Sequence, residues 1–202
     1  MNHKVNSVQQ LYDDAKKMHD VVVLEKADGI INNLNQAINQ LKSSWEGKDA
    51  GVQINNVVDV YNAMTKIRNT LVELAKDSSL VASNYREIQN ANRANLETLA
   101  PITSEGEKLV MEPYEDNRDT INITAEAVSG KHLLDSVNEQ YDDFKESVNR
   151  CYNAIMDNWQ AGPNRDKAQT AFGEFMTSSN KYKEILQDVS QSITDALKNY
   201  SM

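Results

Sequence analysis

Four long stretches of this sequence carry apolar residues at alternating spacings of three and four, and this pattern most constrains the possible fold. The first stretch runs from Leu24 through Leu34 to Trp45. Such spacing places the apolar side chains on one face of an α-helix. The other three stretches cover residues 57–88, 134–159 and 168–200. The sequence therefore predicts an all-α protein without a β-sheet, with long helices near residues 8–44, 50–99, 120–158 and 165–200.

Each pair of stretches is separated by a tryptophan that is followed within three residues by a glycine. In the first separation, Gly47 follows Trp45 and can take the left-handed conformation that ends a helix. In the second, Gly162 follows Trp159, and Pro163 suits the first turn of a new helix. Each pair of helices is therefore expected to form an antiparallel hairpin.

The two halves of the chain align without a gap at an offset of 114 residues, the separation of Trp45 and Trp159. At this offset Leu41 falls on Ile155. The chain has only two tryptophans, and both fall at equivalent places, which indicates an internal repeat. We expect a first hairpin in residues 1–100, an acidic linker in residues 101–119 and a second hairpin in residues 120–202.

A single hairpin of this kind leaves one broad apolar stripe uncovered. The second hairpin can cover that stripe within the same molecule, because an extended linker spans roughly 3.3–3.6 Å per residue. The sequence thus predicts an antiparallel four-helix bundle, an intramolecular pseudo-dimer that is a monomer in solution. The alternative is a domain-swapped dimer, in which each hairpin pairs with a hairpin of another chain.

Composition excludes some classes of partner. The chain has 21 Lys and Arg residues against 30 Asp and Glu residues, a net charge of −9. Nucleic-acid binding requires a cationic surface, so no nucleic-acid partner is expected. The longest apolar run, residues 21–24, is too short to span a bilayer. The first residues also lack the basic and apolar regions of a secretory signal peptide.

No constellation of catalytic, cofactor-binding or metal-binding residues is visible in the sequence. The three histidines are scattered, and Cys151 lies on an apolar stripe, where a small core residue is expected. We therefore expect a protein that is not an enzyme and has no cofactor. The turn residues are the candidate site, as structural plugs of the helix ends and as a possible contact for a partner: Trp45, Gly47, Trp159 and Gly162.

Trp45-Glu46-Gly47, placed between two striped helices, resembles the motif of the WXG-motif family, the early-secreted-antigen-like proteins of type VII secretion. The second turn, Trp159-Gln160-Ala161-Gly162, has one residue more than the Trp-x-Gly pattern. The resemblance covers nearly the whole chain. Members are helical hairpins that pair as antiparallel dimers, so two repeats in one chain imply a fused pair.

The resemblance implies a secreted substrate or co-secretion partner that leaves the cell without a signal peptide. Its implied partners are the secretion ATPase, other WXG-like proteins or a toxin. Mycobacterial systems also use a Tyr-x-x-x-Asp/Glu signal, and the glutamates after Tyr85 and Tyr182 have a different spacing. Two expectations remain: a low-GC Gram-positive system with looser signals, or an intracellular helical adaptor or scaffold that is not exported.

Overall fold

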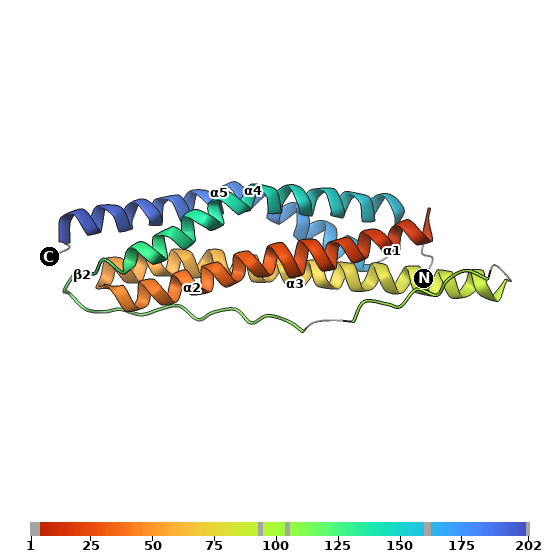
Figure 1. The fold of residues 1–202 in the computed structure, drawn as a ribbon, viewed down its shortest axis with the longest axis horizontal. Helices are drawn as coiled ribbons and strands as arrows, with labels where there is room; N and C mark the ends of the chain where they lie inside the picture. The colour runs from red at the N-terminus through yellow and green to blue at the C-terminus, as the bar shows by residue number, and fades with distance from the viewer. Residues whose placement is uncertain (1–4, 93–94, 104–105, 160–162, 201–202) are drawn as a thin grey trace. The chain divides into compact units, whose positions relative to one another are not determined.

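The structure is a computed structural model that describes residues 5–92, 95–103, 106–159 and 163–200 (Figure 1). It confirms the all-α prediction. No helix in these ranges is long and apolar enough to cross a membrane. The elements in chain order are α1 (Val8–Lys17), the π-helix η1 (Met18–Ala27), α2 (Asp28–Ser44), β1 (Trp45–Glu46), α3 (Lys48–Ala91), β2 (Asn122–Ile123), α4 (Ala127–Asn158) and α5 (Pro163–Tyr200).

The chain folds into two compact units, and each unit draws on both halves of the sequence. Unit 1 comprises Met1–Ala27, Ile67–Lys108 and Phe144–Met176. Unit 2 comprises Asp28–Lys66, Leu109–Asp143 and Thr177–Met202. The units therefore do not follow the division into residues 1–100 and 120–202.

Unit 2 has an apolar core to which four helices contribute. Most of the fully or nearly buried side chains lie at the positions of the predicted stripes, three or four residues apart, and Ile54 lies three residues before the second stripe begins. Tyr200, the last residue of the fourth stripe, is exposed. The principal core residues are Ile31, Leu34, Ile38 and Leu41 of α2, Ile54, Val57 and Met64 of α3, Leu134, Val137 and Tyr141 of α4, and Leu186, Val189 and Ile193 of α5.

Unit 1 contains the largest departure from the predicted helices. The stripe of residues 24–45 predicts a regular helix, yet Met18–Ala27 is a π-helix, whose hydrogen bonds join residues five apart. The wider turn buries Met18, Val22 and Val23 and leaves Leu24 only half-buried. The stripe prediction was therefore wrong at Leu24.

The helix α3 ends at Ala91, whereas the sequence predicted an end near residue 99. The Asn90 side chain provides the reason, because its Oδ1 accepts a hydrogen bond from the Leu96 N–H at 2.7 Å and its Nδ2 donates to the Leu96 carbonyl at 3.0 Å. Asparagine side chains compete in this way with helical main-chain bonds. Asn95 also has a φ of +48°, in the left-handed region.

Asparagine side chains of α3 bind the extended chain that follows this helix. In unit 2, the Asn62 Oδ1 accepts from the Met111 N–H at 2.7 Å and its Nδ2 donates to the Met111 carbonyl at 2.9 Å. Asn55 makes the same two bonds to Tyr114, at 2.7 and 2.9 Å. In unit 1, Asn69 makes both bonds to Lys108, at 3.1 and 2.9 Å. We call Asn55, Asn62 and Asn69 the asparagine ladder.

Candidate functional site

The first turn contains Trp45 and is joined to the start of α4 within unit 2. The strands β1 and β2 are antiparallel, with Trp45 opposite Ile123. The Thr124 N–H also donates to the Ser44 carbonyl at 2.9 Å. The Trp45 side chain is 3% exposed, so the indole is a core group. The prediction of no sheet was wrong at this point, since the tryptophan turn pairs its main chain with the segment that precedes α4.

Two features of the structure favour glycine at position 47. The φ of Gly47 is +113°, a conformation that side chains rarely adopt. A Cβ on this residue would also lie 2.5 Å from the Thr120 carbonyl oxygen. The Gly47 carbonyl accepts from the Gly51 N–H at 3.0 Å, so Gly47 is the N-cap of α3. The positive φ predicted for Gly47 is confirmed. Gly47 was predicted to end the preceding helix, however, and that helix, α2, ends at Ser44, whereas Gly47 begins α3.

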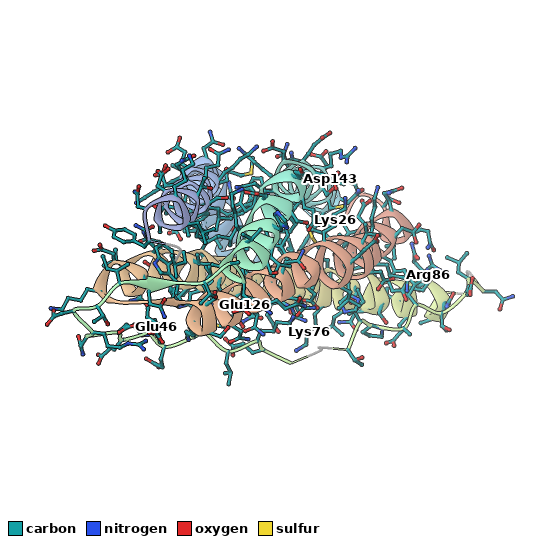
Figure 2. The ribbon with its side chains drawn as sticks, turned by 60° about the vertical axis from the view of Figure 1, so that its left-hand side comes forward. Lys26, Glu46, Lys76, Arg86, Glu126 and Asp143 are labelled. Carbon is teal, nitrogen blue, oxygen red and sulfur yellow. The ribbon has the colours of Figure 1, made fainter. Side chains whose placement is uncertain are left out.

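A cluster of charged residues surrounds this turn. The Asp116 carboxylate accepts from the Gly47 N–H at 2.9 Å and from the Arg118 guanidinium at 2.9 Å (Nε) and 2.7 Å (Nη2). Arg118 also lies 2.7 Å from the carboxylate of Glu46, which is labelled in Figure 2. These donors lower the pKa of Asp116 well below the ordinary value of an aspartate, and the hydrogen bonds from Arg118 have the largest effect. The linker residues Asp116 and Arg118 thus bind Gly47 and Glu46 of the turn.

The second turn repeats the first within unit 1. Trp159 forms an antiparallel bridge with Val5, just before α1, as Trp45 does with Ile123 before α4. The Asn6 N–H donates to the Asn158 carbonyl at 3.0 Å, at the position equivalent to the Thr124–Ser44 bond. The Trp159 side chain is 1% exposed. Each tryptophan turn therefore contacts the segment that opens the other repeat.

Gly162, the remaining turn residue of the predicted site, lies outside the described residues. In the described part of this turn, the Trp159 carbonyl accepts a hydrogen bond from the Nε of Arg165, at the start of α5, at 2.8 Å. Both indoles are buried, as side chains that plug the helix ends would be. A contact between the turn residues and a partner protein stays a prediction.

A groove of about 290 Å³ lies beside the first turn, within unit 2. Trp45 forms part of its wall, and the indole Nε1 is buried without a hydrogen-bond partner among the described residues. The exposed carboxylates of Asp49 and Asp195 line the groove, and the Lys198 ammonium lies 3.8 Å from that of Asp195. Ile121 and Tyr200 add exposed apolar surface.

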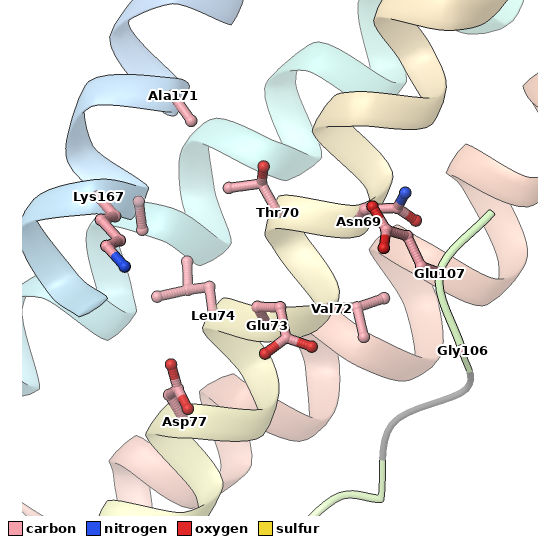
Figure 3. A pocket seen from close by; sticks show the side chains of 11 residues that line it. Asn69, Thr70, Val72, Glu73, Leu74, Asp77, Gly106, Glu107, Lys167 and Ala171 are labelled. Carbon is pink, nitrogen blue, oxygen red and sulfur yellow. The ribbon is translucent and has the colours of Figure 1, made fainter. Parts of the chain in front are cut away.

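A larger cleft, of about 450 Å³, lies within unit 1 between α3, residues 106–107 and α5. In Figure 3, Leu74 and Asp77 of α3 point toward Lys167 of α5. Glu73 and Glu107 add two more carboxylates to a lining that also contains alanine and valine side chains. None of the predicted site residues lines this cleft.

Cys151 is buried in the core of unit 1, the position predicted from its apolar stripe. Burial raises the pKa of the Cys151 thiol and so lowers the fraction of reactive thiolate. Across the described ranges, no group of three or more His, Cys, Asp and Glu side chains is placed to bind a metal ion.

Sequence reasoning missed the residues that attach the linker to the helices. Asp116 lies in the stretch predicted as an acidic linker, and Arg118 was assigned no role. No local pattern distinguishes either residue from the other charged residues of the linker. The asparagine ladder does have a signal, because Asn55, Asn62 and Asn69 recur every seven residues along one helix. A polar stripe at that spacing indicates a second, non-apolar contact face.

Comparisons of the chain with protein-family models, with curated proteins and with solved structures find no match.

Proposed function

We propose that this chain is a non-enzymatic helical protein of a type VII, WXG-motif secretion system, either a secreted substrate or a co-secretion partner. The observation that carries the proposal is the repeated turn contact: Trp45 with Ile123, and Trp159 with Val5. In each case the tryptophan turn of one repeat pairs with the start of the other. When two separate hairpins pair antiparallel, the turn of each is expected to lie beside the chain ends of the other, so the same kind of contact would form between chains.

The same contacts support an antiparallel four-helix pseudo-dimer as the architecture of the whole chain. Each unit buries apolar residues from both repeats, such as Leu34 with Leu134 in unit 2 and Leu11 with Val148 in unit 1. A stripe that one hairpin leaves exposed is then covered within the same molecule. Linking the two hairpins raises their effective concentration, which favours the monomer over a swapped dimer.

The groove beside Trp45 is the surface that we assign to partner recognition in this proposal. It combines the exposed carboxylates of Asp49 and Asp195 with the exposed apolar surface of Ile121 and Tyr200. We expect the partner to present a basic residue beside an apolar side chain.

Export is tested by comparing the extracellular protein in the source bacterium with and without its secretion ATPase. A cytoplasmic protein measured in the same supernatants controls for lysis. We expect the extracellular level to fall to that of the lysis control when the ATPase gene is deleted. An unchanged extracellular level contradicts the proposal.

The groove is tested in the same assay with Asp49→Lys/Asp195→Lys, both at exposed positions. We expect at least a fivefold loss of export, because the reversed charges repel a cationic partner. Asp188→Lys is the matched control, since Asp188 is exposed on α5 but does not line the groove. Far-UV circular dichroism of each variant checks that the helices are intact.

An intracellular adaptor that shares the hairpin fold is the second candidate function. It is favoured by the absence of a Tyr-x-x-x-Asp/Glu spacing after Tyr85 and Tyr182. The genes beside this one distinguish the two functions, because a neighbouring secretion ATPase gene supports export. For an adaptor, the extracellular protein never exceeds the lysis control.

A further inference from the structure

The linker residues 109–116, here called the strap, lie along the polar face of α3 in unit 2 and are attached to it through main-chain atoms. We propose that this face of α3 is a binding site for an extended segment of another protein, and that the strap occupies the site within the intact chain. The ligand class is an extended segment with an apolar residue at one position and an aromatic residue three positions later.

The first argument is the kind of hydrogen bond. Asn55 and Asn62 each use the amide oxygen and the amide nitrogen to bind the N–H and the carbonyl of a single strap residue. A carboxamide offers one acceptor and donors side by side, as the edge of a neighbouring strand does. These side chains therefore recognise a main chain, which any extended segment without proline at the bonded positions supplies.

The second argument is the spacing. Seven residues of α-helix rise about 10.5 Å, from about 1.5 Å per residue. Three residues in polyproline II conformation rise about 9 Å, from about 3.1 Å per residue. Asn55 and Asn62 are seven apart, and the residues that they bind, Tyr114 and Met111, are three apart. The spacing of the two asparagines along α3 therefore matches the spacing of the two strap residues only when the strap is extended. Three residues of helix would rise about 4.5 Å, which is too short.

The third argument is which side chains of the strap contact the protein. Met111 and Tyr114 are half-buried, and the Lys42 ammonium lies 5.0 Å from the centre of the Tyr114 ring, a favourable cation–π contact. Leu109 and Val110, in contrast, are 81% and 52% exposed. The site therefore selects an apolar and an aromatic residue three apart and accepts other residues around them.

The experiment uses the full chain with Met111→Pro/Tyr114→Pro, which removes the two N–H donors of the strap. The probe is a fluorescein-labelled synthetic peptide of residues 109–116, and its binding is followed by fluorescence anisotropy. We expect saturable binding to this variant and at least tenfold weaker binding to the wild-type chain, whose tethered strap competes. Adding Asn55→Ala/Asn62→Ala should weaken binding at least tenfold, because four main-chain hydrogen bonds are lost.

Three controls separate recognition of the main chain from general stickiness. Asn153→Ala should leave the affinity unchanged, because the Asn153 amide donates to Asn149 on α4 at 3.0 Å and is absent from the site. A peptide with serine in place of Leu109, Val110, Glu112 and Glu115 should bind within threefold of the original. A peptide N-methylated at the residues equivalent to Met111 and Tyr114 should not bind.

The proposal is overturned if the released variant shows no saturable binding, or if Asn55→Ala/Asn62→Ala leaves the affinity unchanged. It is also overturned if the serine-substituted peptide fails to bind. Far-UV circular dichroism checks each variant for loss of helix. Should the double proline variant unfold, Met111→Pro alone removes one of the two donors, and the same measurements and outcomes apply to it.

Discussion

Replacing Trp45 with alanine measures how much the first turn contributes to the fold. The indole is 3% exposed in unit 2, so nearly all of its surface leaves water on folding. A large aromatic side chain buries roughly 150–250 Å². At about 25 cal/mol per Å², this area corresponds to roughly 4–6 kcal/mol, of which alanine retains a small part. Measured losses for Trp→Ala in cores are about 3–5 kcal/mol, and we expect a loss in that range.

Urea denaturation followed by far-UV circular dichroism provides the measurement. With a slope of about 2 kcal/mol per M, a loss of 3–5 kcal/mol lowers the midpoint by about 1.5–2.5 M. Trp159→Ala should cost the same, because the Trp159 indole is 1% exposed in an equivalent turn. Val52→Ala is the control: its side chain is 58% exposed near the start of α3, and the expected change is within about 0.5 kcal/mol.

Trp45→Phe refines the interpretation of this loss. The Trp45 Nε1 has no hydrogen-bond partner in the described residues, so phenylalanine removes volume without removing a hydrogen bond from those residues. Its cost should be less than half that of alanine. A loss below about 1 kcal/mol for Trp45→Ala would refute the reasoning from burial. Unequal losses for Trp45→Ala and Trp159→Ala would refute the equivalence of the two repeats.

Further predictions concern glycines, pH and assembly. Gly47→Ala should destabilise the protein by about 1–3 kcal/mol, because its φ is +113° and its Cβ meets the Thr120 carbonyl, and urea midpoints measure this loss. Gly29→Ala should instead stabilise by about 0.5–1 kcal/mol in the same assay, since Gly29 lies in α2 with nothing within 4 Å of its Cβ. The lowered pKa of Asp116 means that its contribution is complete above the unfolded pKa of about 3.9 and is lost as the pH falls through the lower folded value. The difference in midpoint between wild type and Asp116→Asn should therefore be equal at pH 7 and pH 5 and shrink below about pH 4. Sedimentation over a wide concentration range should show a monomer, whereas a dimer that persists on dilution contradicts the pseudo-dimer.

Hydrophobic spacing predicted the helices because burial at every third or fourth residue is a local property of the sequence. The stripe from Leu134 to Trp159 is buried throughout. The same reasoning failed at Leu24, where a π-helix changes the angle between successive residues. The predicted second helix also ran past Ala91, although its apolar stripe stops inside α3 at Ile88, whose side chain is exposed. The apolar spacing does not reveal the hydrogen bonds between Asn90 and Leu96 that end this helix.

The tryptophan turns were located from the sequence, but their contacts were not. Trp45 and Trp159 mark equivalent turns because tryptophan is rare in this chain. Their main-chain pairing with Ile123 and Val5 depends on segments far away in the sequence, which carry no strand pattern of their own. The linker was predicted as an acidic connection. Its attachment to α3 depends on main-chain atoms of the strap, which are the same for every sequence.

The rate at which a reagent labels the single cysteine, Cys151, can measure local opening of this protein. The Cys151 thiol is buried in unit 1, and burial raises its pKa, so a thiol reagent reacts with it only after part of the unit opens. When closing is faster than labelling, the labelling rate relative to an exposed thiol gives the equilibrium constant for that opening. The stability of unit 1 can thus be followed at a single atom in the wild-type chain, without a denaturant and without an engineered probe.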